Sequence, residues 1–106
     1  MLPAANINFT IMKKTDIIIT CDCGKSITID LAEQDLDWEI VETDEREMGV
    51  ERLHEAIFDY ECPDCKKNIT ITLHVWEYPE GFCNMDEIGV EGGELVNGCN
   101  LEDFVL

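Results

Sequence analysis

Alternating and β-branched apolar residues predict a first β-hairpin near the start of this chain. Residues 17–20 form a β-branched run, and residues 26–31 alternate apolar and polar side chains with period two. The segment between them contains Gly24, which can supply the positive φ angle of a tight turn. We therefore expect two strands joined by a turn over residues 21–25.

The same pattern predicts a second hairpin further along the chain. Residues 54–61 and 68–78 have the alternation of half-buried strands, and residues 62–67 join them. The side chains expected on one face of the first strand are Ala56, Phe58 and Tyr60. The second strand is expected to place Ile69, Ile71, Leu73 and Val75 on one face and Thr70, Thr72, His74 and Trp76 on the other.

The remaining segments carry weaker signals. Residues 38–41 predict a short strand, whereas residues 45–53 have some helical propensity that Gly49 interrupts. Residues 88–96 predict a small hairpin around two adjacent glycines, and residues 101–106 predict a terminal helical turn. The expected fold is mainly β, with little helix.

Composition supports one small folded domain spanning residues 1–106. Hydrophobic residues make up 45% of the chain, and none of its apolar runs approaches the roughly 18 residues of a membrane helix. Lys13 and Lys14 follow the first apolar stretch, the reverse of a secretory signal, so we expect a cytoplasmic protein with reduced thiols. Because Met12 resembles an alternative start, residues 1–11 are expected to form a peripheral extension.

The charge balance is strongly acidic and changes which partners are plausible. Twenty-four acidic residues against seven basic ones give a formal net charge of −17. Such a surface repels phosphate backbones, so we do not expect direct binding to nucleic acid. We expect a basic protein partner instead. Residues 32–52 form an acidic insert between the predicted hairpins. The candidate partner-binding residues in this insert are Asp35, Asp37, Glu39, Glu42, Asp44, Glu45 and Glu47.

Four cysteines occupy the two predicted turns. Cys21 and Cys23 lie in the first turn, and Cys62 and Cys65 lie in the second within a Cys-Pro-x-Cys segment. Zinc prefers four soft ligands at about 2.3 Å in a tetrahedron, which two such turns can supply together. Backbone amides that follow the cysteines can stabilise the thiolates. The spacing predicts a closed, structural Zn²⁺ site.

These turns resemble the cysteine knuckles of the zinc-ribbon superfamily, whose members pair two knuckles on adjacent β-hairpins. By position, Cys21 and Cys23 match the first knuckle, and Cys62 and Cys65 match the second. The resemblance implies a small zinc-ribbon-like domain with two zinc-clasped β-hairpins. The first knuckle is Cys-x-Cys-Gly instead of Cys-x-x-Cys-Gly, and Lys66 follows the second knuckle where many ribbons have glycine.

The cysteines and histidines allow other interpretations. The Cys-Pro-Asp-Cys segment also fits a redox motif, but that motif needs a cysteine at a helix N-terminus, and strands flank it here. The isolated Cys83 and Cys99 are expected to behave as small buried hydrophobes. His54 and His74 lie within predicted strands, where structural packing is favoured over metal ligation.

Nothing in the sequence predicts an enzyme. Ser26 is the one serine of the chain, the glycine-rich segment lacks the setting of a phosphate-binding loop, and four cysteines close a zinc ion's coordination shell. We therefore expect a non-enzymatic protein.

Three functional interpretations remain. The first is an acidic inhibitor, such as an immunity or anti-defence protein, whose carboxylates mimic nucleic-acid phosphates toward a basic partner. The second is an interaction module or accessory subunit of a larger intracellular assembly. Its apolar anchors would be Trp38, Trp76, Tyr78 and Phe82, for which core packing is the favoured alternative. The third is that the acidity only keeps the protein in solution.

Overall fold

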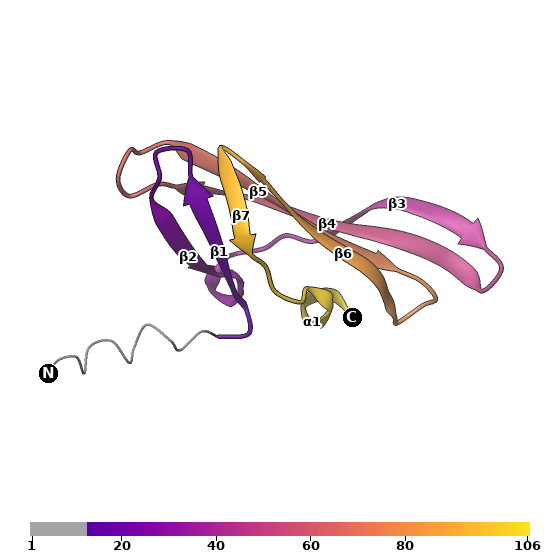
Figure 1. Cartoon of the computed structure of the whole chain (residues 1–106). Helices are drawn as coiled ribbons and strands as arrows, with labels where there is room; N and C mark the ends of the chain where they lie inside the picture. Colours follow the sequence, from indigo (N-terminus) through magenta and orange to yellow (C-terminus); the bar gives the residue numbers. More distant parts are fainter. Residues whose placement is uncertain (1–12) are drawn as a thin grey trace, which may run out of the picture.

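The computed structural model describes residues 13–106, which form two antiparallel β-sheets, so the predicted mainly-β fold is confirmed (Figure 1). The three-stranded sheet has the order β2-β1-β7 and contains β1 (Asp16–Cys21), β2 (Ser26–Asp30) and β7 (Gly93–Asn97). The four-stranded sheet follows chain order and contains β3 (Glu39–Arg46), β4 (Gly49–Glu61), β5 (Asn68–Glu77) and β6 (Cys83–Glu91). In residues 13–106, helix is limited to a 3₁₀ turn, η2 (Leu31–Glu33), and the predicted terminal turn, α1 (Glu102–Val105).

The core lies between the two sheets. The alternation of β5 places one set of its side chains inward, where they are fully buried. These residues are Ile69, Ile71, Leu73 and Val75, as predicted. Isoleucines of β1 and β2 face them from the other sheet, and Leu101, just before α1, closes one side of the core. The core residues that the structure buries are therefore mostly β-branched.

Both predicted cysteine hairpins are present. Strands β1 and β2 pair up to Thr20 and Ser26, which leaves Cys21–Lys25 as the connecting turn. Strands β4 and β5 pair up to Glu61 and Asn68, which leaves residues 62–67 as the second turn. The two turns lie at the same end of the molecule in Figure 1.

The predicted small hairpin over residues 88–96 is wrong. Strand β6 pairs with β5, whereas β7 pairs with β1, so the two consecutive strands belong to different sheets. The chain crosses between the sheets at Gly92 and Gly93, where Gly92 has a φ angle of +97°. Strand β7 pairs with β1, which is remote in sequence, instead of with its neighbour β6. The local sequence pattern does not indicate which of the two partners is chosen.

The helical propensity of residues 45–53 does not produce a helix in the structure. These residues belong to β3, a short turn and β4, which pair from Arg46–Gly49 to Glu39–Glu55. Gly49 has a φ angle of +115° beside the turn. Glutamate and arginine favour helix only weakly, and a continuous ladder with β4 outweighs that preference. The acidic insert is therefore largely the edge of the four-stranded sheet.

The four-stranded sheet extends well beyond the three-stranded one. Figure 1 shows the β3–β4 hairpin projecting away from the end that carries the cysteine turns, and the molecule measures 59 × 30 × 20 Å. Across residues 13–106, no helix is long and apolar enough to cross a bilayer. The peripheral extension predicted for residues 1–11 lies outside the described residues.

Candidate metal centre

The two cysteine turns have related backbone geometry. In the first turn, the amide of Gly24 donates to the Cys21 carbonyl at 2.8 Å, and Gly24 has a φ angle of +95°. In the second turn, the amide of Lys66 donates to the Cys62 carbonyl at 2.9 Å, and Lys66 has a φ angle of +66°. Lys66 therefore adopts the left-handed conformation that Gly24 adopts in the first turn. The second turn contains one residue more, which accommodates Cys-x-x-Cys in place of Cys-x-Cys.

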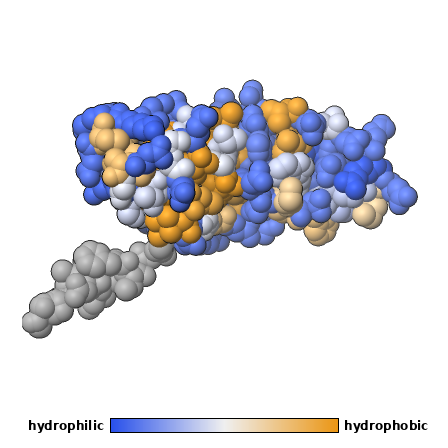
Figure 2. Space-filling view, turned by 45° about the horizontal axis from the view of Figure 1, so that its top comes forward, coloured by the Kyte–Doolittle hydropathy of each residue, from blue (hydrophilic) through white to orange (hydrophobic). Residues whose placement is uncertain are grey.

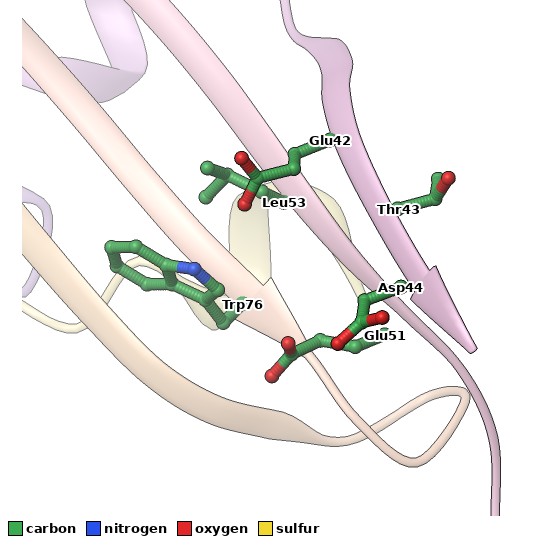
Figure 3. A pocket seen from close by; sticks show the side chains of 6 residues that line it. All are labelled: Glu42, Thr43, Asp44, Glu51, Leu53 and Trp76. Carbon is green, nitrogen blue, oxygen red and sulfur yellow. The ribbon is translucent and has the colours of Figure 1, made fainter. Parts of the chain in front are cut away.

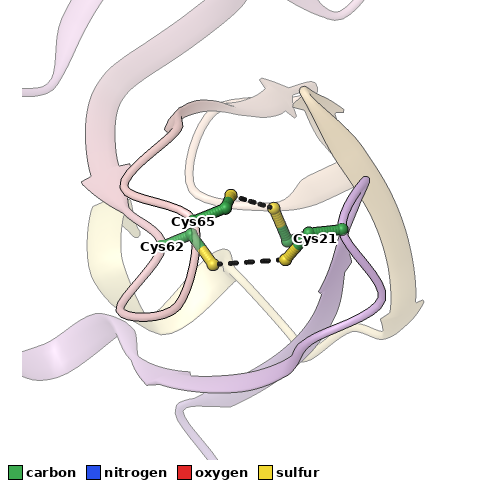
Figure 4. Close-up of side chains that lie close together, drawn as sticks. Cys21, Cys62 and Cys65 are labelled. Atoms are coloured by element: carbon green, nitrogen blue, oxygen red, sulfur yellow. Dashed lines mark hydrogen bonds between the residues drawn. The ribbon is translucent and has the colours of Figure 1, made fainter.

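The four sulfurs converge into one cluster (Figure 4). The Sγ atoms of Cys21 and Cys65 are 3.6 Å apart, those of Cys23 and Cys62 are 3.7 Å apart, and all four lie within 4.8 Å of one another. A tetrahedron with metal–sulfur distances of about 2.3 Å has edges of about 3.8 Å. The separations thus suit a four-coordinate ion and are too long for disulfide bonds, and all six cysteines are free thiols.

Each turn contributes one buried and one exposed cysteine. Cys21 and Cys62 are buried, whereas Cys23 and Cys65 are exposed. The backbone amides of Cys65 and Asp64 donate to the Cys62 sulfur and, against the opposing effect of burial, lower the pKa of Cys62 to about 7. The amide of Cys23 also favours a thiolate at Cys21, but burial and the neighbouring thiols together raise the pKa of Cys21 to about 12.

These opposite pKa shifts describe how the cluster behaves without a cation. Cys62 forms a thiolate readily, whereas Cys21 and Cys23 resist ionisation because burial and the neighbouring thiols disfavour their charged forms. A divalent cation at the centre removes that resistance, so metal binding would release protons and weaken as the pH falls.

Positive charge gathers beside the cluster although the chain is acidic. Three of its seven basic residues lie in the two turns, each within two residues of a cysteine: Lys25, Lys66 and Lys67. The Nζ atom of Lys67 lies 2.6 Å from a carboxylate oxygen of Asp22, and this ion pair joins the two turns. Both side chains are substantially exposed, so the pair contributes little to stability.

A third segment packs against both turns and was missed as part of the site. The amide of Asp22 donates to the carbonyl of Gly92 at 3.2 Å. A Cβ atom at Gly93 would overlap the carbonyl oxygen of Thr20, and one at Gly92 would lie 3.3 Å from the carbonyl oxygen of Asn68. The adjacent glycines were the available signal, but their sequence context indicated a hairpin turn instead.

The other cysteines and the histidines lie apart from the cluster. Cys83 and Cys99 pack against the core, and burial, reinforced by nearby carboxylates such as Asp86, raises the pKa of both thiols. His54 Nε2 is 2.7 Å from Glu77, and His74 Nε2 is 2.8 Å from Glu55. Both histidines are thus partnered by glutamates across the β4–β5 pair.

The seven candidate partner-binding carboxylates are all exposed and occupy one stretch of surface. Two precede β3, four lie on β3, and one lies in the β3–β4 turn: Asp35 and Asp37, then Glu39, Glu42, Asp44 and Glu45, then Glu47. Strand alternation divides those on β3 between the two faces of the sheet. Figure 2 shows a largely hydrophilic surface at this end of the molecule.

The candidate aromatic anchors have different environments. Trp38 packs against the core, as favoured. Trp76 is half-buried on the opposite side of the four-stranded sheet, and Tyr78 is half-buried after β5. Core packing is wrong for Phe82, which is 66% exposed in the β5–β6 turn.

Comparison with protein-family models, curated protein sequences and solved structures finds no match for this chain.

Proposed function

We propose that this chain is a non-enzymatic, zinc-stabilised binding protein whose acidic surface recognises a basic protein partner. An inhibitor or immunity-type protein that imitates nucleic-acid phosphates is the specific form we favour. The proposal places the protein in the cytoplasm, where the thiols stay reduced and available for metal.

Zinc is the proposed ion because of the donor set. Four thiolate sulfurs in a tetrahedral arrangement select Zn²⁺ over the hard cations that prefer oxygen ligands. Four protein ligands leave no open position for water or substrate, so the ion would stabilise the fold and supply no reaction. Elemental analysis of the purified protein should find about one zinc per chain, and a chain free of metal would contradict this assignment.

The observation that carries the proposed binding role is the exposure of β3. All eight of its residues are exposed, and four of them are carboxylates in a chain of net charge −17. The edge strand of the sheet holds these carboxylates on one rigid scaffold, where they can imitate the phosphates of a nucleic acid. A field of this sign can raise the association rate with a basic partner by about 10- to 1,000-fold.

The salt dependence of association tests the binding role. The zinc-loaded protein is used to capture its partner from native cells, and association rates are then measured with the purified partner. We expect the rate to fall at least about tenfold as the screening length shrinks from about 10 Å at 0.1 M salt to about 3 Å at 1 M. An association rate that does not change with salt concentration would contradict the proposal.

A charge-matched pair of variants locates the effect. Replacing Glu42, Asp44 and Glu45 with their amides should slow association about as much as high salt does. Replacing Glu33, Glu94 and Asp103, which are exposed on other elements, removes the same charge and should have a much smaller effect. Equal slowing by both variants would assign the acidity to general repulsion or solubility.

An interaction module of a larger assembly is the second candidate function. The exposure of Phe82 favours it, because a large aromatic side chain without cover is a typical interface anchor. This alternative predicts binding that resists salt and is lost in Phe82→Ala.

A further inference from the structure

One face of the four-stranded sheet is not covered by any described part of the chain. Strand β5 buries alternate residues completely against the other sheet, whereas Thr70, Thr72, His74 and Trp76 on its opposite side are half-buried. We call the surface formed by these four residues and their cross-strand neighbours on β4 and β6 the open face. It spans three adjacent strands of the sheet.

The open face consists of cross-strand rows that differ in chemistry. One row joins Leu53, Trp76 and Met85, and the next joins Glu55, His74 and Glu87. Further rows repeat this order, with Ile57 beside Thr72 and then an acidic pair beside Thr70. Successive rows are about 6.8 Å apart, twice the rise of a strand. Apolar and acidic rows therefore alternate along the face.

The apolar side chains of these rows are accessible. Met85 is 51% exposed and Ile57 is 55% exposed. Trp76 lies on β5, between the strands that carry Ile57 and Met85, and its indole is 5.5 Å from the His74 ring. Isolated exposed apolar residues are common, but here they lie on neighbouring strands of one unpartnered sheet face.

Carboxylates border the Trp76 row. Figure 3 shows Glu42 reaching over Leu53 toward Trp76, whereas Thr43 points away from this group. Asp44 and Glu51 lie together at the next row toward the β3–β4 turn. A cation placed over the indole face would meet both the ring and the carboxylates around it.

The charge of the open face selects its occupant. The four rows through β5 contain carboxylates from both β4 and β6 but no lysine or arginine. A second copy of this chain would bring like charges together, so the face disfavours self-association. An apolar surface rimmed with cations would satisfy both kinds of row.

From this arrangement we propose that the open face is the docking surface for the basic partner. The occupant is a protein surface that presents apolar side chains to the Trp76 and Ile57 rows and lysines or arginines to the acidic rows between them. This inference rests on the proposed binding of a basic partner and adds where and through which chemistry it binds.

Two synthetic peptides of equal length and charge test the proposal with zinc-loaded protein. In an extended conformation, one face of the first peptide alternates lysine and leucine, and the second peptide has serine in place of leucine. We expect the leucine peptide to bind at least about tenfold more tightly by calorimetry. In ¹H–¹⁵N spectra it should shift the indole N–H of Trp76 and the amides of β4, β5 and β6.

Matched substitutions localise the binding. Met85→Lys and Ile57→Lys should each weaken the leucine peptide about fivefold or more. Val96→Lys introduces the same charge at a 61% exposed residue of β7, in the other sheet, and should weaken it less than twofold. Equal effects of all three substitutions would overturn the proposal.

The remaining outcomes separate this inference from the proposed function. If both peptides bind equally and shift only the region of residues 35–47, the open face is not the docking surface, while binding of a basic partner stands. If neither peptide binds at low salt, the proposed function loses its electrostatic basis, and the inference fails with it. Concentration-dependent dimerisation abolished by Met85→Lys would instead identify a second copy as the occupant.

Discussion

The cysteine end and the distal end of the molecule are held together by different interactions. At the cysteine end, two turns (residues 21–25 and 62–67) converge on one cluster of sulfurs, and two sheets enclose a fully buried apolar core. At the distal end, the β3–β4 hairpin and the β5–β6 turn have no second sheet over them (Figure 1). Polar contacts hold this end instead, centred on Glu77 and Tyr78.

The difference indicates that the cysteine end supplies stability and that the distal end is available for recognition. Burial and a metal can make the cysteine end rigid, so the sheet can extend beyond its core without unfolding. The extension exposes both faces of its strands, which is unfavourable for packing but useful for binding. We therefore expect perturbations at the cysteine end to act globally and those at the distal end to act locally.

Metal removal should have the largest effect. Structural zinc contributes on the order of 10 kcal/mol to folding, so chelation should unfold the cysteine end and release the core. Circular dichroism and amide exchange, measured before and after chelation and again after zinc is restored, follow the loss and recovery. Cys65→Ser should behave like the chelated protein, whereas Cys83→Ser should retain the metal. An unchanged spectrum without metal would show that the two sheets suffice.

The cysteine end was also the part most accessible to prediction from sequence. The alternation over residues 68–78 identifies β5 because one face of that strand is buried and the other is not. The paired spacing of the cysteines predicts their convergence because short turns place both side chains of a pair at one hairpin tip. Neither inference requires knowledge of contacts distant in sequence.

The distal end resisted prediction for physical reasons. In β3, both faces are exposed, so there is no apolar period to detect, and its glutamates favour other structures. At the cysteine end, the crossing at Gly92 and Gly93 also escaped prediction, because it depends on β7 pairing with β1, some 75 residues away along the chain. The open face likewise combines residues of separate strands. The sequence therefore indicated the negative charge of the acidic insert but not the neighbouring surface that carries the apolar rows.

A methyl group at the sheet crossing should have the second-largest effect. In Gly93→Ala, the added Cβ would overlap the Thr20 carbonyl oxygen next to Cys21, and the backbone must shift. We expect a loss of about 2–3 kcal/mol in the free energy of unfolding, measured by urea denaturation with excess zinc. Gly89→Ala is the control, because its nearest neighbour is 3.9 Å away and it lies on the open face. Equal losses would show that strand propensity, not the crossing, is being measured.

Removing the charge of Glu77 should have a moderate, pH-dependent effect. Glu77 is 7% exposed and contacts His54, Arg52 and the amide of Gly81. The hydrogen bond with His54 is the largest cause that lowers the pKa of Glu77 from its ordinary value of 4.5, reinforced by Gly81 and Arg52. Because the folded pKa is lower than the unfolded one, this stabilisation is complete above about pH 4.5 and is lost as the pH falls through the folded pKa.

Glu77→Gln should therefore cost about 1–2 kcal/mol at pH 7, and the difference from wild type should shrink in acid. Urea denaturation of both proteins at each pH, with zinc in excess, measures that difference while the acid sensitivity of the metal site affects both equally. Glu61→Gln, at the exposed end of β4, is the control and should cost much less at pH 7. A constant difference across pH would assign the role of Glu77 to its shape instead of its charge.

The smallest effect should come from Tyr78→Phe at the tip of the distal end. The amide of Met48 donates to the Tyr78 hydroxyl at 2.9 Å, and the Arg46 guanidinium lies 4.7 Å from the ring centroid. Phenylalanine keeps the ring under Arg46 and removes only the acceptor, so we expect about 0.5–1 kcal/mol of destabilisation. Amide exchange should accelerate at Met48 and its neighbours while the amides of residues 69–75 stay protected. Accelerated exchange throughout the core would show that the distal end is coupled to the cysteine end, so that partner binding at the hairpin could be transmitted to the metal site.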